Sequence, residues 1–485
     1  MILLISTTNL IVNTLPMPIN KNAVTQKQEE NKENSPRELK ANIEYDTYMI
    51  LYYKKMCIYL RGFKNNYRKR ISYIIQKSNK NKLKTYKMLI ISKSNGIEIH
   101  FNEPVRNLEY FFSRAYDENM AYLASIDFSH FDSSLVTNTR SMFSGCSSLD
   151  SISLSNFNTS LITDMTYMFS DCSSLKSISL INLKTSKLLD MNSMFSGCSS
   201  LKSINLSKFD ASSLTNMANM FYMCYSLESI DLSNFTTLSK ISMEKMFYGC
   251  SSLQLINLSN FEVSSITNMN SMFYGCSSLK SIDLSNLNLS NVLSMNNMFY
   301  DCNSLKSINF AKLNAKKVTT MSNIFNSCKS LKFVNFSHMN VSSLLSMSSM
   351  FSDLNSLENI DLSYADASSV HNLTNIFYRC SSLKYINLTH FKVPSALYIY
   401  SMFYQCTSIQ LINLTFFNVS SVVDMNSMFY GCNSLQSIYL PKFDLSSVTN
   451  IGYMFYGCIS LKSIDLRIFN NSLASNMEYI FYGCI

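Results

Sequence analysis

The chain has 485 residues, of which 47% are hydrophobic and 15% charged, and this excludes a simply disordered protein. Its 10 Gly and 6 Pro are too few for a collagen-like or Pro/Gly-rich linker architecture. The formal net charge of +9 falls within residues 1–122, which hold 20 Lys/Arg and 11 Asp/Glu, so the rest of the chain is neutral.

Residues 1–42 are predicted to lie outside any folded core. Residues 1–15 are apolar, but they lack a basic start and are interrupted by Thr7, Thr8 and Asn9, so they only partly match a signal peptide. Residues 20–42 are rich in Lys, Glu and Asn, a composition typical of a disordered linker.

Residues 43–122 form a basic N-terminal region. Residues 47–97 contain 13 Lys/Arg and no Asp/Glu, a composition that suits contact with an anionic surface. No nucleic-acid-binding motif accompanies these charges, so nucleic acid is not favoured as a partner. The apolar run at 48–53 is interrupted by Lys54 and Lys55, and it is far shorter than the roughly 20 residues of a membrane-spanning helix.

The end of this region is predicted to cap a repeat array. Apolar runs at 88–91 and 97–101 flank Asn95-Gly96, which is a strong signal for a β-hairpin. Leu108 and Phe112 match apolar positions of the repeat described below, and five extra residues separate them from the strand that follows. A hairpin followed by a degenerate coil is what an atypical terminal repeat should look like.

Residues 123–485 repeat with a period of 26. The Phe of a Met-Phe or Ile-Phe pair recurs from Phe143 to Phe481 in thirteen steps without insertion or deletion. A Cys follows each Phe after three residues, from Cys146 to Cys484, except where Leu354 takes its place. Such regularity indicates a tandem-repeat solenoid of about thirteen coils.

Each repeat is expected to contain one short helix. Met165, Met168, Phe169 and Cys172 follow the spacing i, i+3, i+4, i+7, which would place them on one helix face. Asp164 precedes them as a plausible N-cap.

Each repeat is also expected to contain one strand. In Leu175-x-x-Ile178-x-Leu180 the last two apolar residues alternate with polar ones, as in a strand with one buried face. Strands of successive coils would form one parallel sheet. The predicted fold class is therefore an α/β repeat solenoid, leucine-rich-repeat-like, with one parallel-sheet strand and one short helix per 26-residue coil.

The residues that could carry chemistry are better explained as scaffold. The cysteines form one inward column without His partners at zinc spacing, and the methionines fill the core. No P-loop, Gly-x-Ser-x-Gly or dinucleotide motif is present, and no coil inserts a loop that could gather catalytic groups. No enzyme activity, metal or cofactor is expected.

The open face of the sheet is the candidate binding surface. Outward strand positions are polar, mixed in sign and rich in hydroxyls, so they could form a solvated face or a weak multivalent binding face. The candidate binding residues are Lys176, Ser177, Lys202, Ser203, Asn205, Asp231, Asn257, Lys280, Asp283, Lys306 and Asn309.

The repeat resembles a known family. The run Met-Phe-x-Gly-Cys-Ser-Ser-Leu-Lys-Ser-Ile-x-Leu-Ser, as in residues 272–285, is similar to the repeats of BspA-like leucine-rich-repeat surface proteins of bacteria and protists. The similarity covers residues 123–485. It implies a surface-exposed or secreted protein that mediates adhesion or binds a protein or glycan on a cell surface or matrix.

Three hypotheses follow. The first is a non-catalytic surface or secreted binding protein without a transmembrane span. The second is a cytoplasmic protein–protein interaction scaffold, suggested by the poor signal sequence and the many unpaired cysteines. The third is end-to-end assembly, because the sequence stops at Gly483-Cys484-Ile485 before a further strand, as in a chain that is truncated or covered at that end.

Overall fold

The structure is a computed structural model. It describes six short segments between residues 47 and 101, and residues 103–484 apart from gaps of one to four residues. Residues 45–485 form one compact unit. The apolar stretch 1–15 and the predicted linker lie outside the described residues, as do most side chains of the basic stretch 47–97.

The N-terminal part is an antiparallel sheet with the strand order β4-β3-β6-β1-β7. A separate pair joins β2 to β5. The predicted hairpin is wrong, because the strands on either side of Asn95-Gly96 pair elsewhere: β5 with β2, and β6 with β1 and β3. The strands are β1 Thr47–Tyr53, β2 Cys57–Ile58, β3 Ile71–Gln76, β4 Asn81–Leu83, β5 Leu89–Ile90, β6 Ile97–Phe101 and β7 Leu123–Asp127.

This sheet joins the repeat array through β7. Strand β1 pairs antiparallel with β7, and the chain between β6 and β7 stacks on the first repeat. The amide of Phe112 donates to the carbonyl of Met142 at 2.9 Å, and the rings of Phe112 and Phe143 stack at 5.5 Å. Their offset of 31 residues is the 26-residue period plus the five inserted residues.

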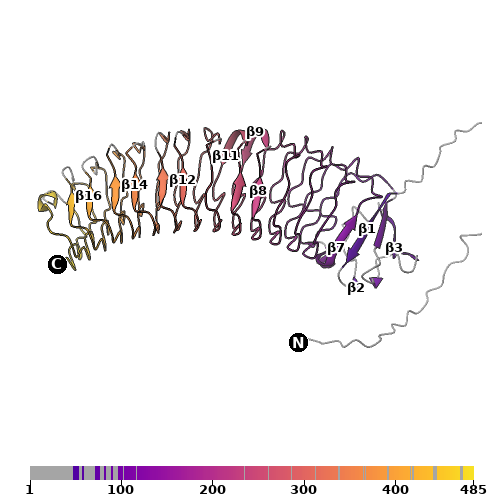
Figure 1. Cartoon of the computed structure of the whole chain (residues 1–485), viewed down its shortest axis with the longest axis horizontal. Coiled ribbons are helices and arrows are strands. Elements are labelled where there is room, and N and C mark those ends of the chain that lie inside the picture. Colours follow the sequence, from indigo (N-terminus) through magenta and orange to yellow (C-terminus); the bar gives the residue numbers. More distant parts are fainter. Residues whose placement is uncertain are drawn as a thin grey trace, which may run out of the picture. The chain divides into compact units, whose positions relative to one another are not determined.

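Successive coils stack in parallel, as Figure 1 shows for the strands of residues 229–439. Ile230 pairs with Ile256, and Ile308 with Val334, each 26 residues apart. The predicted parallel solenoid is therefore confirmed, but the predicted single sheet with one strand per coil is not: the strands of this face form separate two-stranded pairs, and the coils of Ile152 and Ile282 have no strand there. The sheet-face strands are β8 Ser229–Asp231, β10 Leu255–Asn257, β12 Ser307–Asn309, β13 Phe333–Asn335, β14 Asn359–Asp361, β15 Tyr385–Asn387, β16 Leu411–Asn413 and β17 Ser437–Tyr439, and a second pair is β9 Thr236–Ser242 with β11 Glu262–Asn268.

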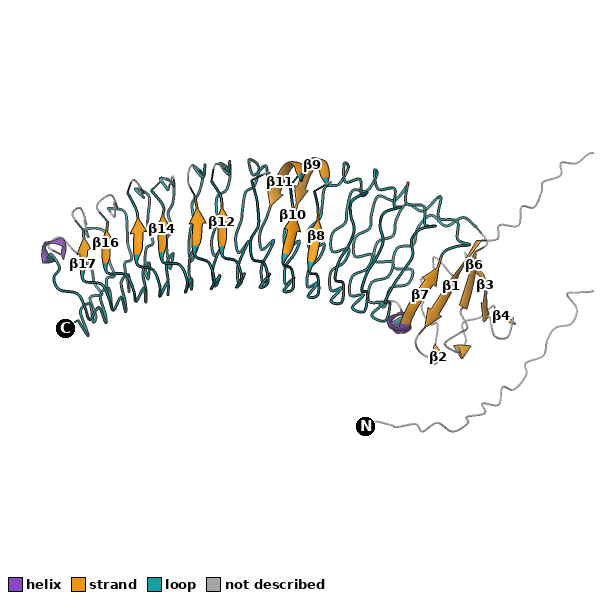
Figure 2. Cartoon of the chain, viewed as in Figure 1, coloured by secondary structure: helices purple, strands orange, loops and turns teal. Residues whose placement is uncertain are grey.

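The predicted helix in each coil is wrong. Figure 2 shows turns and loops there, and the helices among the described residues are two 3₁₀ segments, η2 Glu118–Tyr122 and η3 Leu466–Phe469. Alternate amides bond to the next coil: Tyr167 donates to Asn192 O and Phe169 to Met194 O, both at 2.9 Å. Tyr167 also has φ 56°, which a right-handed helix does not allow.

The predicted N-cap is a turn residue instead. The Asp164 carboxylate accepts a hydrogen bond from the Thr166 amide at 2.8 Å. Asn138 and Asn216 accept from the residue two positions on in the same way, at 2.8 and 3.0 Å. A side-chain oxygen bonded at i+2 defines an Asx turn, so this column opens the series of turns rather than a helix.

The core is a stack of identical side chains. The rings of Phe143, Phe169 and Phe195 lie 5.3 and 5.6 Å apart and nearly parallel, and the stack continues to Phe481. Each column thiol bonds to a Phe carbonyl of the preceding coil; Cys172 Sγ, for example, lies 3.2 Å from the carbonyl oxygen of Phe143. The inward face of each coil is therefore buried by its neighbours.

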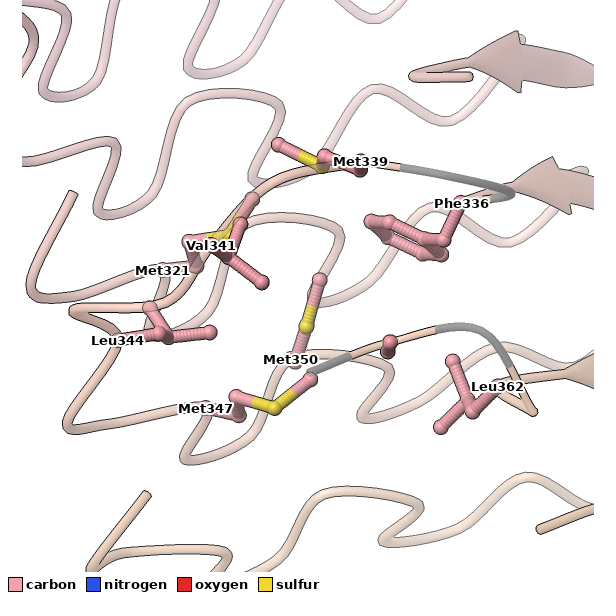
Figure 3. A pocket seen from close by; sticks show the side chains of 9 residues that line it. Met321, Phe336, Met339, Val341, Leu344, Met347, Met350 and Leu362 are labelled. Atoms are coloured by element: carbon pink, nitrogen blue, oxygen red, sulfur yellow. The ribbon is translucent and has the colours of Figure 1, made fainter. Parts of the chain in front are cut away.

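One coil departs from this packing. Ala365 occupies the corner position where Phe157, Phe209 and Leu313 stand in other coils. Beside it lies an apolar cavity of about 10 Å³, shown in Figure 3 and lined partly by Met350. The missing side-chain volume of Ala365 accounts for this gap. The cavity is too small and too apolar to hold a ligand or an ordered water.

Candidate binding face

The outward side chains of the strands form three parallel columns on what we call the open face. In the coil of Lys202, Ser203 and Asn205 these three side chains point to solvent, while Ile204 is 7% exposed. Because successive coils pair in register, each outward position is repeated along the array at about 4.8 Å per coil. We call the columns the Lys column, the middle column and the Asx column, after Lys202, Ser203 and Asn205.

The sequence-predicted binding residues all lie on the open face. Lys176, Lys202, Lys280 and Lys306 belong to the Lys column, and Ser177 and Ser203 to the middle column. Asn257 is half-buried and the others are exposed. The structure brings these residues into three lines rather than into a pocket. The members in the Asx column are Asn205, Asp231, Asn257, Asp283 and Asn309.

The Asx column has a structural role. The side-chain oxygens of Asn205, Asp231 and Asp283 each accept a hydrogen bond from the amide two residues later, at 2.9 Å. These bonds form an Asx turn at the end of each strand. The Oδ1 atom of each of these side chains thus takes part in the fold.

The Lys column carries most of the positive charge of the face. Lys202 lies 3.6 Å from Glu228, and Lys384 lies 2.9 Å from Glu358 in the adjacent coil. The hydrogen bond from Lys384 and its charge lower the pKa of the Glu358 carboxyl. These pairs are exposed, so they contribute little to stability.

Large apolar side chains replace the small polar ones in the C-terminal half of the open face. Phe333, Tyr385 and Leu411 occupy the middle column and are 58–60% exposed. Tyr439 lies at the next outward position, in the Asx column, and is 58% exposed. We call these four residues the apolar patch. The sequence-predicted binding residues end at Asn309, and the same middle column reaches Phe333, Tyr385 and Leu411 further along the sequence.

Opposite charges flank the apolar patch. In the five coils of the patch, the Lys column contains Lys332 and Lys384 with Glu358, for a net charge of +1. The Asx column of the same coils contains Asp361 and no basic residue, for a net charge of −1. The patch therefore lies between an edge of net positive charge and an edge of net negative charge.

The cysteine column offers no reactive site. Its thiols are buried, except that of the half-buried Cys484, and burial raises the pKa of Cys380 and of Cys458 to about 12. A thiol with such a pKa stays protonated near neutral pH and is neither a nucleophile nor a metal ligand. Among the residues that the structure describes, no group of three or more His, Cys, Asp or Glu side chains is arranged to hold a metal ion.

The Leu-x-x-Ile-x-Leu pattern recurs every 26 residues, with replacements such as Phe310 and Val334, and successive coils pair in parallel, which together define a leucine-rich-repeat-like solenoid. Within the described part of the chain, no helix is long and apolar enough to span a membrane.

Three solved structures share a distant likeness with the chain. A leucine-rich-repeat protein of Leptospira interrogans is 13% identical, with 69% of this chain and 86% of that chain covered and a TM-score of 0.22. The plant peptide hormone receptor RGFR1 in complex with RGF2 is 13% identical, with coverages of 70% and 74% and a TM-score of 0.17. The functional domain of InlJ from Listeria monocytogenes, which includes a cysteine ladder, is 13% identical, with coverages of 68% and 71% and a TM-score of 0.17. These scores are low, so the description of the fold rests on the coil geometry itself.

Comparisons by sequence give a clearer result. No curated protein matches the chain. One family model matches repeatedly, at residues 106–229, 201–309, 226–333, 305–412 and 397–485, which together span the array. The chain therefore belongs to the family described as "Mycoplasma protein of unknown function, DUF285".

Proposed function

We propose that the protein is a non-catalytic binding protein of the cell surface or extracellular space, which recognises a protein partner through the open face. The observation that carries the proposal is the contrast between a core that repeats its Phe and Cys side chains and an outward column that changes from Ser177 to Phe333 and Leu411. Exposed contiguous apolar side chains on a soluble face are typical of interaction sites.

The surface location rests on the resemblance to BspA-like proteins, whose repeats share the Phe-x-x-Cys-x-x-Leu-x-x-Ile-x-Leu pattern. The alternative of an intracellular scaffold drew its support from the poor signal sequence and from the unpaired cysteines. Burial of the column removes the second of these grounds, because a thiol that reagents cannot reach stays reduced in either compartment. Adhesion through a glycan, and contact of residues 47–97 with an anionic surface, are secondary proposals within the same hypothesis.

The experiment has two parts. Protease treatment of intact cells that naturally express the protein is expected to cleave it, and recovery only from the cytosol would contradict the surface location. Cells carrying the variant Tyr385→Ser/Leu411→Ser are expected to lose most of their adhesion to protein-coated surfaces. The matched control is Leu255→Ser, which changes a middle-column Leu outside the patch. Equal adhesion of both variants and the wild type would contradict binding through the open face.

A further inference from the structure

The apolar patch has a regular geometry along the array. Tyr385 lies one coil beyond Asn359, its pairing partner, and Asn359 is one coil beyond Phe333. Leu411 follows in the next coil, and Tyr439 pairs with Asn413 one coil further on. At about 4.8 Å per coil, the four steps from Phe333 to Tyr439 extend about 19 Å along the stacking axis.

This spacing matches a helix better than an extended peptide. A helix presents apolar residues at i, i+3, i+4 and i+7, and so returns to the same face once per turn of about 5.4 Å. An extended strand presents one face every 6.6–6.8 Å or so, which falls out of step with a 4.8 Å repeat within two coils. About 13 helical residues cover the 19 Å of the patch.

The charges beside the patch determine which charged residues such a helix should carry on each of its two sides. Lys332 and Lys384 lie on one side, with Glu358 between them and 2.9 Å from Lys384, and Asp361 lies on the other side. Positions three residues apart on a strand are separated by about 10 Å, the diameter of a helix with its side chains. A helix seated between the two columns would therefore bring one flank near the lysines and the other near Asp361.

We propose that the apolar patch binds a single amphipathic α-helix of a partner protein, aligned with the stacking axis, with acidic residues toward the Lys column and basic residues toward the Asx column. This inference rests on the proposed function, because it specifies the partner of the open face. Since the two edges differ in charge, the helix is held in one orientation.

The test is selection from a displayed library of random 16-residue peptides on the full chain. The recovered peptides are expected to carry apolar residues at i, i+3, i+4 and i+7, with acidic and basic flanks, and to become helical on binding by circular dichroism. Binding measured by fluorescence anisotropy should weaken about tenfold with Leu411→Ser and less than twofold with the matched variant Leu255→Ser. Lys332→Glu should weaken it severalfold, and less so at high salt.

Several results would overturn the proposal: recovery of no binder, peptides that bind equally well to Leu411→Ser, or a concentration-dependent dimer of the chain that Leu411→Ser abolishes. Extended peptides that still require Leu411 would overturn the helix while leaving the proposed function intact. Peptides insensitive to every open-face substitution would count against both.

Discussion

The core and the open face are built from the same repeats, but the core residues are nearly constant from coil to coil whereas the outward residues vary. The ring of Phe273 is fully buried and stacks on Phe247 and Phe299 at 5.5 and 5.4 Å. Phe333, in the middle column, is 58% exposed and lies where other coils have Ser. A core position must fit the coil above and the coil below, so a change there affects the packing of both neighbours, whereas an outward position is free to change.

The largest effect is expected from alkaline pH, which acts on several buried thiols at once, Cys380 and Cys458 among them. Burial raises the folded-state pKa of Cys380 and Cys458 to about 12, whereas an unfolded thiol has a pKa of about 8.5. The unfolded state therefore releases protons first. The stability that these thiols provide is complete below about pH 8.5 and is lost as the pH rises toward 12, at about 1.4 kcal/mol per thiol per pH unit.

Urea unfolding followed by circular dichroism between pH 7 and pH 11 measures this loss. Alkylation by iodoacetamide at pH 8 is the companion measurement, and the column thiols of the native chain should resist it while those of the unfolded chain react. An unfolding midpoint that stays constant up to pH 11, or rapid alkylation of the native chain, would show that the cysteines are not held as buried neutral thiols.

Removal of one Phe ring is expected to affect stability very differently in the core and on the open face. Phe273→Ala should lower the free energy of unfolding by about 3–5 kcal/mol, because it removes a fully buried ring and leaves a cavity between two neighbours. Phe333→Ala removes the same atoms from an exposed position and should change stability by about 0.5 kcal/mol or less. Urea denaturation of both variants tests the comparison, and equal losses would refute it.

The smallest effect is expected where the core itself departs from its repeat. Ala365→Leu should raise the free energy of unfolding by about 1 kcal/mol, because the added side chain would cover the apolar corner beside Met350 that Leu and Phe cover in other coils. The reverse change in the same column, Leu313→Ala, should cost about 2 kcal/mol or more. Thermal and urea unfolding measure both, and a destabilised Ala365→Leu variant would mean that the coil has no room for the side chain.

The sequence was sufficient to predict every structural feature that follows from period alone. The 26-residue recurrence, the inward Phe and Cys columns and the parallel stacking needed only the positions of Phe143, Cys146 and their repeats. The turns at residues 165–172 were beyond that reasoning. A spacing of i, i+3, i+4, i+7 keeps side chains on one side both in a helix and in a series of tight turns, and only the positive φ of Tyr167 separates the two.

The remaining differences have separate causes. The pairing of β6 with β1 and β3 depends on contacts between distant segments, which a local Asn-Gly signal does not report. The apolar patch was visible in the sequence, since Phe333, Tyr385 and Leu411 share the column of Ser177. It was missed because the outward positions were described together as polar, and such a description hides the few coils that carry an apolar residue.

The unbroken register of the coils also bears on how such a protein can change over generations. Each coil bonds to its neighbours through the same backbone groups and the same Phe and Cys positions, so one coil can be duplicated, deleted or exchanged for another without altering the joints. A lineage can therefore shuffle Ser, Leu, Phe and Tyr along the open face by recombination between repeats. New recognition surfaces would then arise faster than point substitution in a conventional core would permit.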